Sequence, residues 1–401
     1  MALKKYMKKF VSNRPELFVS LLMMFLLAGL ATIFSPYFLG VNPNLSFSLP
    51  SLFVWLFAAA SFLLGLKYGK GLFALKQLPI IILFILASVF FSVFYFVPIY
   101  ISVIFCIVGY VVSYLLMNYN RNFLHLYALG ALLLCVNMVF LGVPLLDIQM
   151  HVASSRESLG LLDFANPLFV AGFYFMLYSL VRMHGKVDKR RFWLLFVALF
   201  VLAALSSFRL YPALVFLTAL FLELKSIRLG NRSALLPLSL VLVVFVAFFV
   251  LVGNALEAAK GNEIGGPIEV AQYRPGFTLH VFDDVVKKSF PFGYAFGGTY
   301  YSQEGNGDIA VCRMLYGCSS RIASTAFGET MLNFGLEGVF VLMFFVAAVL
   351  GKLYEIDYPL YALGMAQAIA AIEIGFNVPF IMIFAILYLR LIGWIPLRKR
   401  A

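Results

Sequence analysis

Residues 234–253 read ALLPLSLVLVVFVAFFVLVG, a run of twenty residues without a charged side chain. A helix rises about 1.5 Å per residue, so a helix of this length crosses the hydrocarbon core of a bilayer, which is about 30 Å thick. The backbone groups of a helix bond to one another, as a segment surrounded by lipid requires. The stretch therefore predicts a membrane-spanning helix.

The composition of the whole chain agrees with this prediction. Of the 401 residues, 63% are hydrophobic and 12% are charged, and the mean hydropathy is +0.98. A soluble domain carries about 45–50% apolar and about 25% charged residues. Most of the surface must therefore face lipid, and the chain is predicted to be an all-α polytopic membrane protein.

Other apolar stretches bring the prediction to about twelve transmembrane helices. Residues 78–117 would form two, hinged at Pro98, because proline cannot continue the hydrogen-bond ladder of a helix. Residues 192–224 would also form two, with the outer turn at Ser206–Arg209, because basic clusters flank both ends. The remaining helices are predicted at 17–38, 52–66, 123–146, 167–183, 234–253, 328–351, 358–375 and 380–395.

Lys and Arg residues gather in short gaps between the apolar stretches. This is the positive-inside pattern of cytoplasmic loops, so both termini are predicted to be cytoplasmic and the protein to lie in the cytoplasmic membrane of the cell. No basic patch alternates with aromatic residues, so nucleic acid is not an expected partner. The clusters are Lys4, Lys5, Lys8, Lys9 and Arg14; Lys67, Lys70 and Lys76; Lys186, Lys189, Arg190 and Arg191; Lys225, Arg228 and Arg232; and Arg398, Lys399 and Arg400.

The pattern divides the chain into three parts. Residues 1–253 hold predicted helices one to nine, residues 254–327 form one large extracytoplasmic loop, and residues 328–401 hold helices ten to twelve. The loop is too long for a simple connector, so it is the expected place for chemistry.

Two cysteines of that loop, Cys312 and Cys318, would form a structural disulfide in an oxidising exterior. The alternatives are two free thiols or an opportunistic metal site. The sequence contains no phosphate-binding glycine loop and no histidine pair with zinc spacing, so no metal and no cofactor is expected.

Three arginines lie on the predicted outer side, where basic residues are otherwise few. Arg209 sits between two apolar stretches, where an arginine needs a partner or water. Arg274 lies in the large loop, and Arg156 lies in the loop of residues 147–166. Each could instead be an ordinary arginine, with Arg209 reaching the headgroups and the other two solvated.

A polar stripe follows the large loop. Glu329, Asn333 and Glu337 are spaced by four and would share one helix face, which must point to protein or to a hydrated cavity. Glu373 near the outer end of the next helix could line the same cavity. The alternative is a packing seam whose polar groups are satisfied.

Several segments resemble a known family. SSFRLYPALVFLTALFL at 206–222 resembles the Ser-Arg helix start of O-antigen polymerases and O-antigen ligases. Residues 274–298 resemble their large-loop pattern of an arginine, a short helix and a Pro-x-Gly turn near Pro291–Gly293. TAFGETMLNFGLEGVFVLMFF, followed by LGKLYE, resembles the helix after that loop in oligosaccharide repeat unit polymerases. The resemblance covers about 206–355 and the topology. The histidine and asparagine common in the ligase branch are missing at Ser324–Ala326, which favours a polymerase.

The resemblance implies a metal-independent glycosyltransferase of the C-type membrane fold. Such an enzyme moves a glycan from a polyprenyl pyrophosphate carrier to a hydroxyl of another lipid-linked repeat unit, so both substrates are lipid-linked oligosaccharides. Arg209, Arg274 and Arg156 would hold the pyrophosphate, because guanidinium groups bind phosphates bidentately. Glu329 is the first candidate for the general base, with His280, Asp284 and Glu373 as alternatives. Further partners would be membrane lipids and a flippase or a chain-length protein.

Three other functions remain open. A ligase-like enzyme would transfer the glycan to a different acceptor. A transporter or flippase for a lipid or an anion would also need charge within the membrane, but usually shows inverted repeats and broken helices. An assembly partner without catalytic activity would not need the arginines or Glu329.

Overall fold

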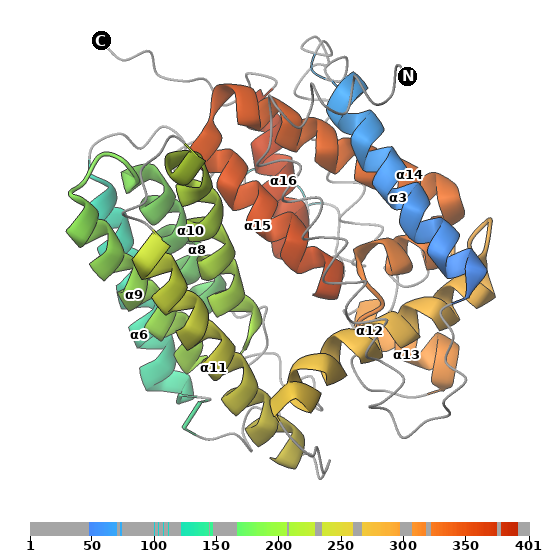
Figure 1. Ribbon diagram of the computed structural model, residues 1–401, viewed down its shortest axis with the longest axis horizontal. Helices are drawn as coiled ribbons and strands as arrows, with labels where there is room; N and C mark the ends of the chain where they lie inside the picture. The colour runs from blue at the N-terminus through green and yellow to red at the C-terminus, as the bar shows by residue number, and fades with distance from the viewer. Residues whose placement is uncertain are drawn as a thin grey trace.

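The computed structural model describes residues 48–69, 122–143, 167–206, 208–228, 235–259, 267–296, 307–317, 322–374 and 378–391, with a few isolated positions between them (Figure 1). The regular elements in these ranges are all helices. They are α3 (Leu49–Tyr68), α6 (Phe123–Leu141), α8 (Pro167–Met183), α9 (Lys189–Leu205), α10 (Leu210–Arg228), α11 (Leu235–Ala259), α12 (Pro267–Ser289), α13 (Gly307–Tyr316), α14 (Ala326–Ile356), α15 (Tyr358–Ile374) and α16 (Val378–Leu391).

The hydrophobic pattern places most of these helices correctly. The prediction of two helices within 192–224 is met by α9 and α10, which are separated at Ser206–Arg209. Among the described residues, four helices are long and apolar enough to cross a membrane, namely α3, α6, α11 and α14. The helices predicted at 17–38 and 78–117 lie outside the described residues, apart from isolated positions, so the count of about twelve stays a prediction.

Three predicted boundaries are wrong by five residues or more, and one of them is the end expected at 351, because α14 continues to Ile356. The helix expected at 123–146 ends at Leu141, where Gly142 follows with a φ of 84°. The helix expected to end at 253 continues to Ala259, because residues 254–259 (NALEAA) are mostly good helix formers. The segment 254–327 is also not a plain loop, since it contains α12 and α13.

The helices form two groups that are joined by α15 and by a contact between α11 and α12 (Figure 1). One group contains α6, α8, α9, α10 and α11, and the other contains α3, α12 and α14. Helix α15 packs against α8 and α10 of the first group and against α14 of the second, and α16 packs on α14 and α15. One large hydrophobic core therefore runs through both groups. A second, smaller cluster of buried residues joins α12, α13 and the first half of α14.

Helix α3 packs very closely on the second half of α14. A Cβ atom on Gly65 would overlap the carbonyl oxygen of Phe344. Small residues at such a contact let two membrane helices approach to backbone distance, where van der Waals packing is strongest. Helix α12 packs against both of these helices.

Helix α14 is interrupted at Gly335, which has a φ of 65° and a ψ of −155°. The turn of residues 290–296, which follows α12, fills the break. The N–H of Leu336 donates to the Pro291 carbonyl at 2.9 Å, and two N–H groups of the turn donate to the Leu332 carbonyl at 2.7 and 2.9 Å. The backbone groups next to the break are thus partnered by another part of the chain, as buried backbone requires.

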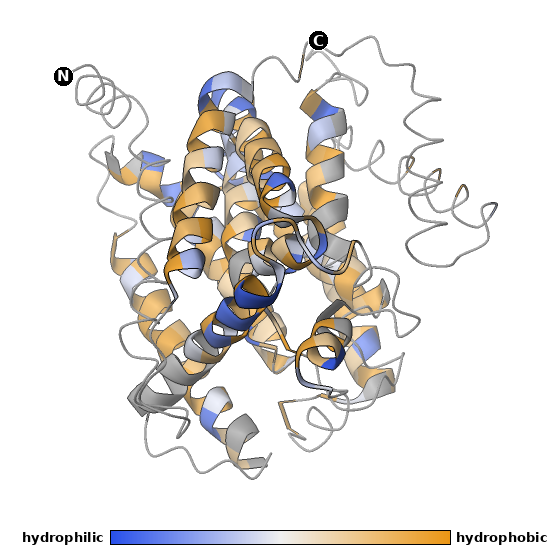
Figure 2. Cartoon of the chain, turned by 90° about the vertical axis from the view of Figure 1, so that its right-hand side faces the viewer, coloured by the Kyte–Doolittle hydropathy of each residue, from blue (hydrophilic) through white to orange (hydrophobic). Residues whose placement is uncertain are grey.

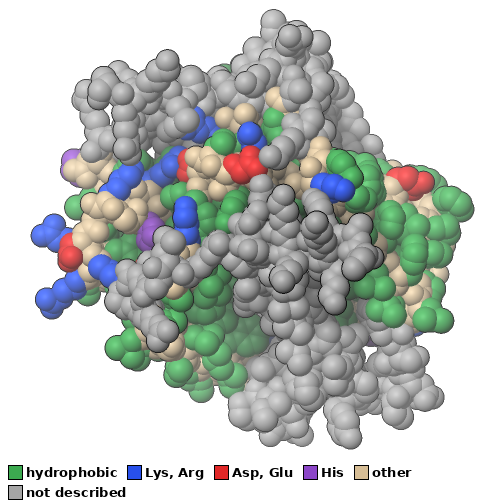
Figure 3. Space-filling model, turned by 45° about the horizontal axis from the view of Figure 1, so that its top comes forward, with side chains coloured by type: hydrophobic (Ala, Val, Ile, Leu, Met, Phe, Trp, Pro, Cys, Tyr) green, Lys and Arg blue, Asp and Glu red, His purple; other side chains and the backbone are tan. Residues whose placement is uncertain are grey.

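Charged side chains lie at both ends of the molecule. Arg182 at the end of α8 contacts Asp357 between α14 and α15 at 2.9 Å, and His184 contacts Glu223 of α10 at 3.3 Å. Figure 3 brings this end forward and shows Lys, Arg, Asp and Glu side chains in a band beside hydrophobic surface. At the other end, α12 lies across the bundle as a largely hydrophilic helix (Figure 2).

Candidate functional site

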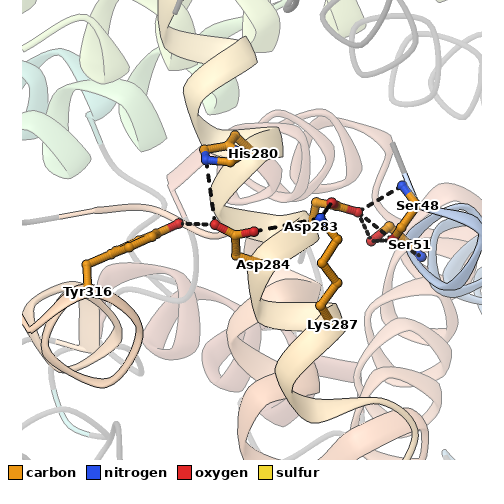
Figure 4. A network of polar contacts seen from close by, with 7 residues as sticks. All are labelled: Ser48, Ser51, His280, Asp283, Asp284, Lys287 and Tyr316. Carbon is orange, nitrogen blue, oxygen red and sulfur yellow. Dashed lines mark hydrogen bonds and ion pairs between the residues drawn. The ribbon is translucent and has the colours of Figure 1, made fainter. Parts of the chain in front are cut away.

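Helix α12 is bound to the start of α3 through Asp283 (Figure 4). Its Oδ1 accepts hydrogen bonds from the Ser48 hydroxyl at 2.6 Å, the Ser51 hydroxyl at 2.6 Å and the Ser48 N–H at 3.0 Å. Its Oδ2 lies 2.5 Å from Lys287 Nζ, one turn later on α12. Burial alone would raise the pKa of Asp283, but the hydrogen bonds from Lys287, Ser48 and Ser51 outweigh it and hold the pKa below its ordinary value.

The next residue, Asp284, binds α12 to α13. Its Oδ2 accepts a hydrogen bond from the Tyr316 hydroxyl at 2.7 Å and lies 3.5 Å from His280 Nε2 (Figure 4). Its Oδ1 lies 3.9 Å from Lys287 Nζ. Burial and this hydrogen bond to Asp284 raise the pKa of Tyr316, so the tyrosine stays a hydrogen-bond donor at neutral pH.

Aromatic packing joins α12 and α3 to the first half of α14. The ring centroids of Trp55 and Phe327 are 4.6 Å apart, and those of Phe282 and Phe327 are 5.4 Å apart. A Cβ atom on Gly328 would lie 2.9 Å from the Phe282 ring. The first turns of α14 are therefore fixed directly beside α12.

Two residues of the predicted polar stripe lie in this fixed segment. Glu329 is 3% exposed and Asn333 is fully buried, and Asn333 Nδ2 donates to the Glu329 carbonyl at 2.9 Å. Glu337 is exposed. The prediction that all three share one helix face is wrong, because the break at Gly335 separates Glu337 from the other two.

The predicted arginines are only partly described. Arg209 is half-buried in the turn between α9 and α10, and its guanidinium lies 4.6 Å from the ring centroid of Phe249 on α11. The backbone of Arg274 lies in α12 and that of Glu373 in α15, whereas Arg156 and the side chains of Arg274 and Glu373 lie outside the described residues.

Comparison with known protein families shows to which family the chain belongs. A family model described as "Putative O-antigen polymerase" matches residues 12–385. The chain belongs to this family. The family model spans nearly all of the described helices, so the resemblance seen in the sequence is confirmed, and the apolar helices make this member an integral membrane protein.

A distant relative gives no information about the activity. An uncharacterized protein of Methanocaldococcus jannaschii is 24% identical over 265 residues, which are 65% of this chain and 62% of that protein. The chain thus spans less than two thirds of the length of this relative. No solved structure matches the chain.

In this member of the O-antigen polymerase family, Cys312 is buried and disulfide-bonded. Its predicted partner Cys318 lies outside the described residues, so the pairing stays a prediction. The described residues contain no group of three or more His, Cys, Asp or Glu side chains that could hold a metal ion.

Sequence reasoning missed the anchoring role of Asp283 and the contact from Tyr316 to Asp284. Asp283 and Lys287 stand four apart, which is the spacing of an ion pair on a helix and could have predicted α12. Ser48 before Pro50 is a helix-start signal. Nothing in the local sequence says that this start meets α12, because the two segments are 235 residues apart.

Proposed function

We propose that this protein joins polyprenyl-pyrophosphate-linked oligosaccharide repeat units into a polysaccharide at the outer face of the cytoplasmic membrane. The match of the O-antigen polymerase family to residues 12–385 is the observation that carries this proposal. The arrangement of α3, α12, α13 and α14 supports it, because these helices collect buried and half-buried polar side chains at one end of an apolar bundle.

The distribution of charge supports the placement of α12 and α13 outside the cytoplasm. The ends of α8 and α10 carry Lys and Arg residues, and they meet the start of α15 at the opposite end of the bundle from α12. Membrane proteins retain such basic ends on the cytoplasmic side.

The proposed reaction needs a site that stabilises a pyrophosphate and one that removes a proton. Arg209 and Arg274, with Arg156 as a third member, would bind the departing polyprenyl pyrophosphate by charge-assisted hydrogen bonds. Glu329 and His280 are the two candidates to accept the proton of the acceptor hydroxyl. Arginines that neutralise the pyrophosphate let the reaction proceed without a metal ion, and this independence is part of the proposal.

The break in α14 bears on the transporter alternative. Transporters often bind ions or substrates at the unpaired backbone of a broken helix. Here the turn of residues 290–296 supplies partners to Leu332 and Leu336 on both sides of Gly335. The backbone groups beside the break are thus hydrogen-bonded to another segment of the same chain. The break therefore gives no support to a substrate site in the membrane.

Reconstitution in liposomes separates the candidate functions. The probe is radiolabelled lipid-linked oligosaccharide extracted from cells that lack this gene. A polymerase produces a ladder of whole repeat units on the lipid carrier. Transfer to an acceptor without pyrophosphate would indicate a ligase, and unchanged probe moved across the bilayer would indicate a flippase. The same assay with a flippase or a chain-length protein added tests these proposed partners.

A further inference from the structure

The turn that follows α12 alternates between aromatic and small residues. Residues 290–296 read FPFGYAF. The aromatic side chains are exposed, whereas the residues between them are half-buried. The exposed fractions are 40% for Phe290, 74% for Phe292, 52% for Tyr294 and 76% for Phe296. One edge of the turn is thus directed at the protein, and the other edge presents aromatic rings to the surroundings.

The protein-facing edge holds the turn in a fixed shape. The Pro291 carbonyl accepts a hydrogen bond from the Leu336 N–H at 2.9 Å. A Cβ atom on Gly293 would lie 2.8 Å from the backbone nitrogen of Gly335, so a larger residue does not fit there. Ala295 packs against the smaller cluster of buried residues that joins α12, α13 and α14. The aromatic rings therefore cannot turn inward without breaking these contacts.

The aromatic edge would be unfavourable in water. Phe292 and Phe296 leave most of their side chains exposed, although removing an aromatic ring from water is strongly favourable. Phe296 also has a φ of 45°, a conformation that is strained for a bulky residue and that the surroundings must compensate. A contiguous exposed apolar patch of this kind marks a contact with a protein or a membrane.

The contact with α3 identifies the partner as the bilayer. Helix α3 is long and apolar enough to cross the membrane. The ring of Phe290 packs edge-on against the ring of Phe53 on α3, with 5.9 Å between the centroids. The exposed side chains around this position of α3 are also apolar, namely Leu49, Leu52 and Leu56. The turn therefore lies at a depth where α3 faces lipid.

Helix α14 indicates the same depth. Residues 336–356 follow the break and form about 31 Å of helix, which matches the thickness of the hydrocarbon core. The break, and the turn that fills it, therefore lie at one boundary of the core. Charged groups are present at this level, because Glu337 is exposed and Lys288 Nζ lies 4.6 Å from the centroid of the Tyr294 ring. Aromatic residues are enriched at this boundary in membrane proteins.

We infer that residues 290–296 form a membrane-inserted turn, whose aromatic side chains lie in the interfacial region of the bilayer and hold α12 and α13 against the membrane. The partner of the aromatic edge is the lipid of the leaflet at this end of the molecule. This inference rests on the chain being a membrane protein and not on the proposed reaction. In the proposed orientation the leaflet is the outer one, so the turn holds α12 at the level of the pyrophosphate groups of the lipid carriers.

The test places a fluorophore on the turn of the full-length protein in liposomes. Cys106 and Cys135 are replaced by alanine, and Phe292→Cys and Phe296→Cys are each labelled with an environment-sensitive dye. Quenching is measured with iodide on both sides of the membrane and with lipids that carry a spin label just below the headgroup. The spin-labelled lipid should quench both dyes, and iodide should quench them several-fold less than it quenches a dye on α13.

Two further positions are the matched controls. Arg313→Cys on α13 replaces an exposed residue on the aqueous side, and Val341→Cys replaces an exposed apolar residue in the second half of α14. Iodide quenching as strong as at Arg313→Cys, without quenching by the spin-labelled lipid, would overturn the inference. Iodide quenching that is relieved only by added lipid-linked oligosaccharide would also overturn it and assign the aromatic edge to glycan.

The two labelled positions make the test robust to a folding defect. If Phe292→Cys fails to fold, Phe296→Cys decides, because either dye alone reports the depth of the turn. The quenching pattern does not depend on polymer formation. A wild-type protein that forms no ladder in the liposome assay would therefore refute the proposed function and leave this inference to the quenching result.

Discussion

Arg209 is the best-described member of the proposed pyrophosphate site. Its guanidinium lies over the Phe249 ring, 4.6 Å from the centroid, which ties the turn before α10 to α11. A planar cation held against an aromatic ring keeps one orientation, and a fixed fork of N–H donors suits a phosphate better than a mobile lysine does.

Arg209→Ala should therefore lower the polymer yield about tenfold to a hundredfold while the protein level stays normal, since one charge-assisted contact contributes about 1.5–3 kcal/mol. Arg209→Lys should restore little of this loss, because an ammonium group cannot bind bidentately. Arg191→Ala, at an exposed arginine of α9, is the matched control. Ladder intensity on gels measures the yield, and a wild-type ladder from Arg209→Ala would remove this residue from the site.

Asp283 gives the stability of the protein a dependence on pH. Its pKa is lower in the folded protein than in the unfolded chain, because Lys287, Ser48 and Ser51 bind the ionised form. The resulting stabilisation is fully present above the unfolded value of about 4 and is lost as the pH falls through the folded value.

Asp283→Asn should lower the free energy of unfolding at neutral pH by roughly 1.5–3 kcal/mol, the range for hydrogen bonds to a charged group. The difference in Tm between the variant and the wild type should shrink as the pH falls below about 4 and through the lower folded pKa, where the wild-type carboxylate also becomes neutral. Thermal unfolding in detergent between neutral and acid pH checks this. A difference in Tm that stays constant over that range would disprove the role of the carboxylate charge.

At the scale of elements, α14 works as two helices held in register by a distant turn. Gly335 and Gly317 offer a comparison, because their φ angles are 65° and 66°. A Cβ atom on Gly335 would overlap the Pro291 carbonyl oxygen, whereas one on Gly317 would meet nothing within 4 Å. Alanine strains the backbone at both positions, but it displaces the turn only at Gly335.

Gly335→Ala should lower Tm and abolish polymer formation, because the displaced turn leaves backbone groups of Leu332 and Leu336 without partners. Gly317→Ala should lower stability by only about 1–2 kcal/mol, the cost of a positive φ for a residue with a side chain. Thermal unfolding and the ladder assay measure both effects. Equal losses in the two variants would mean that the turn does not hold the break.

The sequence could predict the apolar helices but not this break. An uncharged run such as 234–253 has few alternatives to a membrane helix, so α11 follows from composition alone. The break depends on hydrogen bonds from residues 290–296, which lie about forty positions before Gly335 in the sequence. Gly335 alone does not predict it, because glycines are common in continuous membrane helices. The spacing of Glu329, Asn333 and Glu337 therefore predicted one polar face where the chain forms two separate segments.

For α12 the sequence failed in the opposite way, because a helix lies where a loop was predicted. Its polar composition suggested a large loop, in which the family resemblance implied only a short helix after Arg274. The structure has a longer helix, Pro267–Ser289, supported by contacts with α3, α13 and α14 that local sequence cannot reveal. Asp283 and Asp284 are adjacent residues, yet they bind different helices because successive side chains of a helix point about 100° apart. The candidate site could thus be predicted as a region, while the roles of Asp284 and Tyr316 required the structure.

At the scale of the whole molecule, the arrangement of charge makes the orientation in the membrane testable. Lys186 follows α8 at the basic end and is exposed, and Arg313 on α13 is exposed at the other end. The positive-inside rule predicts that only Arg313 faces the exterior. In a background with Cys106 and Cys135 replaced by alanine, a membrane-impermeant maleimide should label Arg313→Cys on intact cells, and Lys186→Cys only after permeabilisation. Labelling of both variants after permeabilisation shows that each site can react. The reverse pattern would put α12 and α13 in the cytoplasm, and a polymerase that uses lipid carriers at the outer face could not work in that orientation.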